Sequence, residues 1–172
     1  PPYVGYSLQT VDQRLDMSTA INGDWIGIAD YISCWFVKAA ELISLEKCRA
    51  AFVSTNSIVQ GEQVMGLWKH IMSLDIEIGF AYTSFRWVNN AANNAGVTVV
   101  VIGLQKKSTK SKLLFTENTV TSVHAISPYL TGTKTVFVQK RKQPLSNVRK
   151  LIRGSGPVDG GGLILSEDER RD

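Results

Sequence analysis

The segment that most constrains the fold is Val97–Leu104, an unbroken run of mostly β-branched residues with no polar face. A run of this kind is typical of a strand that is covered on both sides of a sheet. It is too short to cross a bilayer, which takes about 20 apolar residues, and no basic-then-apolar leader precedes it. With 44% hydrophobic and 20% charged residues, the chain has the composition of a globular protein. We therefore expect a folded protein with neither a membrane span nor a secretory signal.

The residues before this run alternate between helical and strand-like patterns. Helical periods run over residues 30–44, with Asp30 as a candidate N-cap, and over residues 61–73. Arg49–Thr55 and Ile76–Tyr82 have the pattern of strands. This order predicts an α/β layered sheet with flanking helices. The last two strands are joined by an Asn- and Ala-rich stretch without a helical period, which favours an antiparallel pair.

Charge is distributed unevenly along the chain. Residues 1–104 carry six basic and nine acidic groups, whereas residues 105–153 carry eleven basic groups against the single acid Glu117. The net charge of +4 therefore understates how basic the second segment is. A basic block of this density indicates a polyanion partner, with a solvated basic loop as the simpler alternative.

These patterns divide the chain into three parts. Residues 1–104 hold the α/β pattern, and residues 105–153 form a basic, irregular segment with short strand-like stretches at Leu113–Phe115 and Thr135–Gln139. Residues 154–172 are a Gly-rich loop followed by an acidic tail.

The chain opens with Pro1-Pro2-Tyr3, which is the first candidate for chemistry. Two prolines fix the backbone and remove two N–H donors, so that the carbonyl oxygens are rigidly aimed. An aromatic ring directly after them can stack on a planar ring whose amine hydrogens the carbonyls accept. Taken alone, the motif is more often a turn or a proline-rich ligand.

Two later segments add to this signal. Ala51–Ser57 ends a predicted strand in small polar residues, where open α/β sheets bind ligands. Phe80–Trp87 is rich in aromatic residues and leads into two asparagines. In order and spacing, these segments and Pro1–Tyr3 resemble the amino-methylating, N6-adenine DNA methyltransferases, closest to the MmeI-like single-chain restriction-modification enzymes. The resemblance covers most of residues 1–165.

The motif of that family is Asn or Asp, then Pro-Pro, then Tyr or Phe. Pro1, Pro2 and Tyr3 match its last three positions, and the polar first position is not in this sequence. The resemblance implies a partial Rossmann-like methyltransferase sheet made of its last three strands. It also implies that a carbonyl of the two prolines accepts the amine of a flipped adenine and that Tyr3 stacks on the base. The methyl donor implied is S-adenosylmethionine.

The same resemblance places Phe85 and Trp87 beside the flipped base, and Asn56 is a further candidate for this pocket. Core packing is the alternative for both aromatics, and for Trp87 it is at least as good an interpretation. Structural capping is the favoured alternative for Asn56 and for the polar residues near it, namely Ser54, Thr55 and Gln60.

A complete enzyme of this class also has a Gly-rich turn after its first strand and an acid at the end of its second. Neither is recognisable here, because Gly160–Gly162 lacks the strand–turn–helix context that such a turn requires. We therefore expect most of the S-adenosylmethionine site to lie upstream of Pro1, and the 172 residues alone to be inactive.

The basic block is expected to bind duplex DNA through its phosphates. Residues 127–130 and 140–145 resemble the junction between the methyltransferase domain and the target-recognition region of the same enzymes. The predicted DNA-binding residues are the basic residues of this block: Lys106, Lys107, Lys110, Lys112, Lys134, Lys140, Arg141, Lys142, Arg149, Lys150 and Arg153.

Other interpretations stay open at this point. The chain is alternatively a non-enzymatic nucleic-acid-binding module, or a structural domain that pairs with another copy through an exposed sheet edge. A His-based nucleophilic site is a weak alternative, because His70 and His124 have no partner pattern. The choice of adenine over cytosine rests on the resemblance alone, because an aromatic ring at position 3 suits either base.

The two cysteines point to no metal site. Cys34 and Cys48 lie in apolar surroundings, and nothing near them has the spacing of metal ligands. We expect buried thiols in a reducing, cytoplasmic setting.

Overall fold

The computed structural model describes residues 1–21, 27–87, 96–139, 143, 146 and 148. The chain divides into two units, Pro1–Gln139 and Lys140–Asp172, and every described helix and strand lies in the first unit. None of the described helices is long and apolar enough to span a membrane.

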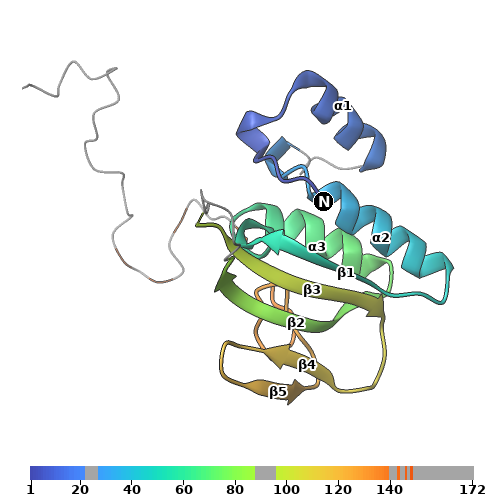
Figure 1. The fold of residues 1–172 in the computed structure, drawn as a ribbon, viewed down its shortest axis with the longest axis vertical. Helices are drawn as coiled ribbons and strands as arrows, with labels where there is room; N and C mark the ends of the chain where they lie inside the picture. The colour runs from blue at the N-terminus through green and yellow to red at the C-terminus, as the bar shows by residue number, and fades with distance from the viewer. Residues whose placement is uncertain (22–26, 88–95, 140–142, 144–145, 147, 149–172) are drawn as a thin grey trace, which may run out of the picture. The chain divides into compact units, whose positions relative to one another are not determined.

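A five-stranded sheet forms one layer of the first unit (Figure 1). In chain order its strands are β1 (Ala50–Thr55), β2 (Ile76–Arg86), β3 (Thr98–Lys106), β4 (Lys112–Phe115) and β5 (Val120–Val123). Their spatial order is β1-β3-β2-β4-β5, in which β3 is antiparallel to both of its neighbours. β2 and β4 are parallel, and β5 is antiparallel to β4. The predicted antiparallel pairing of β2 with β3 is confirmed.

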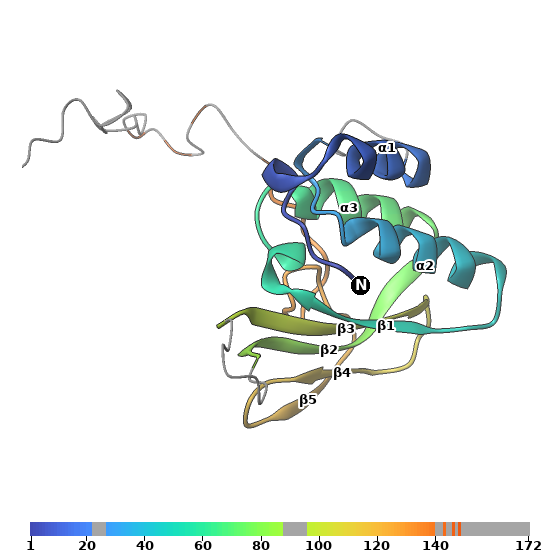
Figure 2. The same cartoon turned by 45° about the horizontal axis from the view of Figure 1, so that its top comes forward.

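Helices cover one face of the sheet (Figure 2). α2 (Ser33–Leu45) and α3 (Gln63–Ser73) pack on the strands, and α1 (Val11–Ala20) packs on α2. The core between the layers is aromatic at its centre, where the ring of Phe36 lies 5.0 Å from Phe52 and 5.9 Å from Trp68. The indole N–H of Trp68 donates to the carbonyl oxygen of Ile58 at 2.9 Å, so its polar atom is satisfied inside the core.

Both predicted helices are present, but the predicted cap of the first one is wrong. α2 begins at Ser33, and its N-cap residue Ile32 makes no side-chain capping bond. The Asp30 carboxylate is buried and binds Tyr6 and Gln63 instead. Because its carboxylate accepts hydrogen bonds from these two residues, Asp30 does not cap α2.

The sequence pattern does not predict α1, because this helix lacks an apolar stripe. Met17 is its one buried residue. The helix is instead begun by a capping box, in which the Thr10 side chain accepts the N–H of Gln13 and the Gln13 side chain accepts the N–H of Thr10.

The strand predictions hold for β1 to β4 and fail for residues 135–139, which form no strand. Phe137 in this segment packs half-buried against the core, and the N–H of Val138 donates to the Tyr129 hydroxyl at 3.1 Å. The apolar alternation there reflects the packing of a loop. β5 was not predicted, because its four residues are exposed or half-buried and carry no apolar face.

The expectation that Val97–Leu104 is covered on both sides is half right. One side of β3 lies under α2 (Figure 2). On the other side the ring of Phe80 lies over Gly103, where a Cβ atom would be only 2.1 Å from the ring. This face is less covered than the other, and Val53 and Tyr82 keep 41% and 40% of their surface exposed.

The sheet also continues past residue 104 into the basic segment. β4 and β5 belong to this segment, and an ion pair of 3.1 Å joins Lys112 of β4 to Glu77 of β2. The Glu77 side of this ion pair is half-buried, and Lys112 is buried. The first part of the basic segment is therefore integral to the α/β unit.

Candidate active site

The Pro1-Pro2-Tyr3 motif lies at the surface. Both prolines are exposed, and Tyr3 keeps 49% of its surface accessible. Directly after the motif, the carbonyl oxygen of Val4 accepts the N–H of Tyr31 at 2.9 Å. The motif is thus open to a ligand, while the chain that follows it is tied to the segment leading into α2.

A buried pair of polar side chains ties the same loop to the sheet. The Asp30 carboxylate accepts the N–H of Tyr6 at 3.2 Å and Nε2 of Gln63 at 2.8 Å. The N–H of Asp30 donates to Oε1 of Gln63 at 3.0 Å, and Nε2 of Gln63 also donates to the carbonyl oxygen of Ser57 at 2.9 Å. Asp30 and Gln63 are only 4% and 7% exposed, so water does not compete for the two bonds between them. The network connects the motif loop to η3 (Asn56–Val59), the 3-10 turn after β1.

The carboxyl ends of β1 and β2 meet at one edge of the sheet. Thr55 and Phe85 both lie opposite Val99, on the two sides of β3. The Ser84 hydroxyl donates to Oδ1 of Asn56, which holds the turn after β1 against the end of β2. Open α/β sheets bind ligands at this edge, so it is the candidate pocket for the target base.

The two aromatics predicted for this pocket differ in exposure. Phe85 is half-buried and lies edge-on to Tyr82, with 6.4 Å between ring centroids. Trp87 keeps 41% of its surface exposed, and its main-chain N–H donates to the carbonyl oxygen of Val97 at 2.8 Å. Trp87 is therefore not a core residue.

The polar residues around Asn56 make local contacts. Ser54 is buried and donates to the carbonyl oxygen of Thr55 at 3.2 Å, and the hydroxyls of Thr55 and Ser57 lie 2.9 Å apart. Gln60 is exposed. These contacts support the structural interpretation of Ser54 and Thr55.

Sequence reasoning missed Gln63 altogether and assigned Asp30 only to a cap. The available signal was a glutamine at the first position of a helix whose next residues are apolar. Its partner lies 33 positions away in the chain, and no local pattern connects the two.

Two family models match the chain. The model of the MmeI DNA-methyltransferase domain matches residues 1–116, and that of the MmeI target recognition domain matches residues 132–172. The chain belongs to the MmeI DNA-methyltransferase family. The resemblance drawn from the Pro-Pro-Tyr motif and the later segments is confirmed.

Two relatives show the same family. DNA methyltransferase A of Bacillus subtilis (strain 168) is 44% identical over 177 residues, which cover 100% of this chain and 20% of that protein. A solved structure of the Type IIL restriction-modification enzyme MmeI in complex with DNA has a TM-score of 0.91 at 36% identity, over 99% of this chain and 24% of that one. The methyltransferase-type α/β fold is thereby confirmed. The chain spans about a fifth of the length of the curated relative.

One lysine predicted to bind DNA in this MmeI-family chain is buried. Lys112 is 3% exposed, lies 3.1 Å from the Glu77 carboxylate and donates to the carbonyl oxygen of Ser108 at 2.7 Å. A cation satisfied in this way is not available to a phosphate. The structure argues against a DNA contact by Lys112, whose contacts hold β4 to β2.

The other described members of the basic set are exposed. Lys106 ends β3, and Lys107 and Lys110 follow it, at the end of the sheet where β2 begins, since Lys106 lies opposite Ile76. This is the far end of the strands from the candidate pocket. Lys134 is exposed in the segment after β5. The remaining predicted residues lie outside the described part of the chain: Lys140, Arg141, Lys142, Arg149, Lys150 and Arg153.

The described residues fit one side of a methyl-donor site. The exposed motif and the polar strand ends suit an amine-bearing base. Of the described strands, β1 alone leads into an α-helix, and a single glycine, Gly61, lies in that connection. A Gly-rich cofactor turn is therefore not found among the described residues.

The titratable groups near the helices serve structure. Burial raises the pKa of the Cys34 thiol to about 11, and a hydrogen bond to Asp16 raises the pKa of Tyr31. The buried thiol predicted for Cys34 is confirmed, whereas Cys48 is half-buried. The described residues contain no group of three or more His, Cys, Asp or Glu side chains that could hold a metal ion.

Proposed function

We propose that this chain is the target-base side of a site-specific DNA methyltransferase that acts in a restriction-modification system. The reaction proposed is methyl transfer from S-adenosylmethionine to the N6 amine of a flipped adenine in duplex DNA. The observation that carries the proposal is the exposed Pro1-Pro2-Tyr3 motif, which a buried hydrogen-bond network ties to the carboxyl edge of the sheet.

The motif positions the reacting amine. A carbonyl oxygen of Pro1 or Pro2 accepts an amine hydrogen, which leaves the nitrogen lone pair directed at the methyl group. Tyr3 stacks on the base and fixes its plane. S-adenosylmethionine supplies an already reactive methyl group, so the main contribution of the protein is to hold the base amine in line with that group.

Asn56, Phe85 and Trp87 form the proposed far wall of the base pocket. The exposed indole of Trp87 and the half-buried ring of Phe85 give apolar surface, and the Ser84 hydroxyl fixes Oδ1 of Asn56. The side-chain amide N–H groups of Asn56 are donors suited to a ring nitrogen of the base.

We assign residues 1–104 to the catalytic domain, and residues 105–153 to a connector and the start of the target-recognition region. Residues 154–172 form a Gly-rich loop and acidic tail in this assignment. The family matches over residues 1–116 and 132–172 support this order, with β4 and β5 as connector strands added to the catalytic sheet. The exposed Lys134 and the basic residues beyond position 139 are the proposed phosphate contacts, and action on DNA implies a cytoplasmic location.

The test is methyl transfer by the full-length protein. Duplex DNA is incubated with S-adenosylmethionine labelled in its methyl group, digested to nucleosides and separated. The expected product is N6-methyl-2′-deoxyadenosine. Label in a cytosine would overturn the adenine assignment, and no label in any nucleoside would overturn the proposed activity.

The isolated 172 residues are expected to transfer no methyl group, because the described part holds the base side of the site alone. They are also expected to self-associate, since β1 and β5 are edge strands of the described sheet. Methyl transfer by the isolated chain, or a monomer in light scattering, contradicts the respective statement.

A non-enzymatic nucleic-acid-binding module is the second candidate, favoured by the exposed Lys106, Lys107 and Lys110. A protein of this kind binds duplex DNA with a steep salt dependence and leaves it unmethylated. The same assay therefore separates the two candidates.

A further inference from the structure

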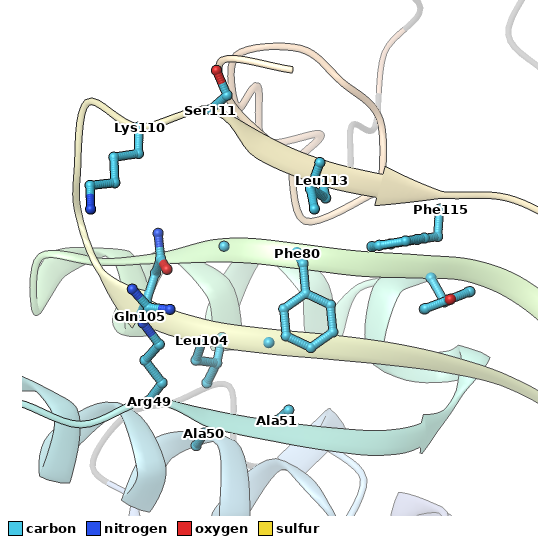
Figure 3. A pocket seen from close by; sticks show the side chains of 13 residues that line it. Arg49, Ala50, Ala51, Phe80, Leu104, Gln105, Lys110, Ser111, Leu113 and Phe115 are labelled. Carbon is cyan, nitrogen blue, oxygen red and sulfur yellow. The ribbon is translucent and has the colours of Figure 1, made fainter. Parts of the chain in front are cut away.

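The open face of the sheet carries a pocket that the proposed methyl transfer does not use (Figure 3). Its volume is about 620 Å³, and residues of β1, β2, β3 and β4 line it. The helices lie on the opposite face (Figure 2). None of the residues of the proposed target-base pocket lines it, although Tyr82 at its edge lies edge-on to Phe85.

An aromatic ring lies flat on the floor of this pocket. Phe80 packs so closely over Gly103 that no side chain larger than glycine fits beneath it. Figure 3 shows the Phe80 ring face-on, between the strands that line the pocket. Beside it, Tyr82 and Phe115 stack on each other with 4.4 Å between centroids and 12° between planes. The pocket thus offers a flat π-face with an aromatic wall.

Cations line one end of the pocket. Arg49 and Lys110 extend toward Gln105 from two sides (Figure 3). A second pocket of about 540 Å³ shares these three residues and adds Lys47 and Lys106, with Glu46 as its single acid. All four cations are exposed, and none lies in an ion pair with a described residue. Their charge is free to bind an anion.

Buried bonds hold this end of the pocket in place. Nε2 of Gln105 donates to the Glu77 carboxylate at 3.0 Å, and the N–H of Ser108 donates to the same oxygen at 2.9 Å. The other Glu77 oxygen pairs with Lys112 at 3.1 Å. The loop that carries Lys110 is therefore fixed at both ends before any ligand arrives.

We propose that this pocket binds a nucleotide, with the base stacked on Phe80 and the phosphate at Arg49 and Lys110. A π-face beside a row of cations is the combination that binds unpaired nucleotides without sequence readout. Lys47 and Lys106 then take the next phosphate of a strand. An unpaired nucleotide of single-stranded DNA or RNA and a free nucleoside monophosphate share this chemistry.

The experiment uses the full-length protein and a fluorescein-labelled eight-nucleotide oligothymidylate, followed by fluorescence polarisation. The double variant Arg49→Gln/Lys110→Gln removes two exposed charges that no described hydrogen bond uses. Its control is Lys38→Gln/Lys69→Gln, which removes the same charge from exposed positions on α2 and α3. Lys38 pairs with Glu41 at 2.9 Å, and an exposed pair of this kind contributes little to stability. We expect the first variant to bind about tenfold more weakly and to lose about 1.4 from the salt slope, at about 0.7 per phosphate. The control stays within about twofold of the wild type.

Phe80→Leu tests the stacking plane separately, because it keeps an apolar group over Gly103. Loss of one stacked base lowers affinity by at least about fivefold. An oligonucleotide that carries 5-bromodeoxyuridine is expected to crosslink at the Phe80 peptide under ultraviolet light. Competition by adenosine monophosphate identifies a free-nucleotide site, and competition by oligonucleotides alone identifies a strand.

Three outcomes overturn the proposal. They are equal losses in the Arg49→Gln/Lys110→Gln variant and its control, crosslinks confined to other peptides, and no binding of any single strand because another part of the full-length protein covers this face. Methyl transfer in duplex DNA is assayed separately on the wild-type protein, so a failure here leaves the proposed activity unaffected.

Discussion

Gln63 and Asp30 bind each other twice across 33 positions of the chain. Nε2 of Gln63 donates to the Asp30 carboxylate at 2.8 Å, and the N–H of Asp30 donates to Oε1 of Gln63 at 3.0 Å. A side-chain amide offers a donor and an acceptor together, which neither a carboxylate nor an apolar side chain can do. The pair therefore joins the loop after the Pro-Pro-Tyr motif to the start of α3 through one specific residue type.

Replacing Gln63 by Leu is expected to lower the free energy of unfolding by about 3 kcal/mol. The Asp30 carboxylate then stays buried with one donor fewer, and the buried N–H of Asp30 loses its acceptor, Oε1 of Gln63. Chemical denaturation of the full-length protein measures the change. Gln60→Leu, at an exposed position, serves as the control and is expected to stay within about 0.5 kcal/mol of the wild type. Equal effects of the two variants would contradict the prediction.

Tyr3→Ala is expected to lower kcat/KM for DNA methylation by roughly tenfold to a hundredfold, because the ring that stacks on the base is lost. Tyr3→Phe keeps the ring and is expected to retain most of the activity. Tyr6→Ala is the matched control, since Tyr6 is exposed to a similar degree, 50% against 49%, and offers only its main-chain N–H to the network. Initial rates with labelled S-adenosylmethionine give the comparison. Full activity of Tyr3→Ala would remove Tyr3 from the site.

Lys112→Met is expected to destabilise the fold by about 3–5 kcal/mol, because the half-buried Glu77 carboxylate then loses its cation. Lys107→Met, at an exposed position on the preceding loop, is expected to cost less than about 0.5 kcal/mol. Urea denaturation of both variants tests the difference. A Lys112→Met protein as stable as the wild type would show that the ion pair does not hold β4 in the sheet.

The Cys34 thiol is expected to resist alkylation at pH 8 in the folded protein. With its pKa raised by burial to about 11, roughly one molecule in a thousand carries the thiolate at that pH. Mass spectrometry after iodoacetamide treatment is expected to find Cys34 modified only after denaturation. Rapid modification in the native protein would show that the thiol is not shielded.

The same shift predicts a pH dependence of stability. The folded thiol holds its proton more tightly than the unfolded thiol, whose ordinary pKa is 9.0. Its contribution is fully present below about pH 9 and is lost, by roughly 2–3 kcal/mol, as the pH rises through 11. Cys34→Ala removes this contribution. Denaturation at pH 8 and pH 11 is expected to show a smaller loss in the variant than in the wild type.

Local patterns predicted the elements that bury an apolar face. Apolar residues recur every three or four positions in α2 and α3, and they are continuous in β3. A short window of sequence therefore reveals all three elements. α1 and β5 were not predicted because they bury few apolar side chains. α1 packs on α2, and β5 pairs with β4. The prediction of a strand at residues 135–139 is wrong, because this segment is a loop that packs Phe137 on the core without pairing with a strand.

The candidate site divides in the same way. Pro1, Pro2 and Tyr3 are adjacent in the chain, and their chemistry is legible from order alone. The contact of Asn56 with Ser84 became visible only with the sheet, because β3 brings the ends of β1 and β2 to the same residue, Val99. Lys112 shows the converse, since a basic run appears uniform in sequence until burial separates one member from the rest.

By itself the sequence determined the α/β class, the antiparallel final pair, the family and the motif at its start, because these depend on neighbouring residues or on their order. Tertiary structure alone decided that Asp30 pairs with Gln63 and Lys112 with Glu77, and that Phe80 lies open above Gly103. The physical reason is that burial and hydrogen-bond partnership are properties of pairs distant in the chain. Which polar groups are satisfied inside, and which stay available to a ligand, is settled only when the chain is packed.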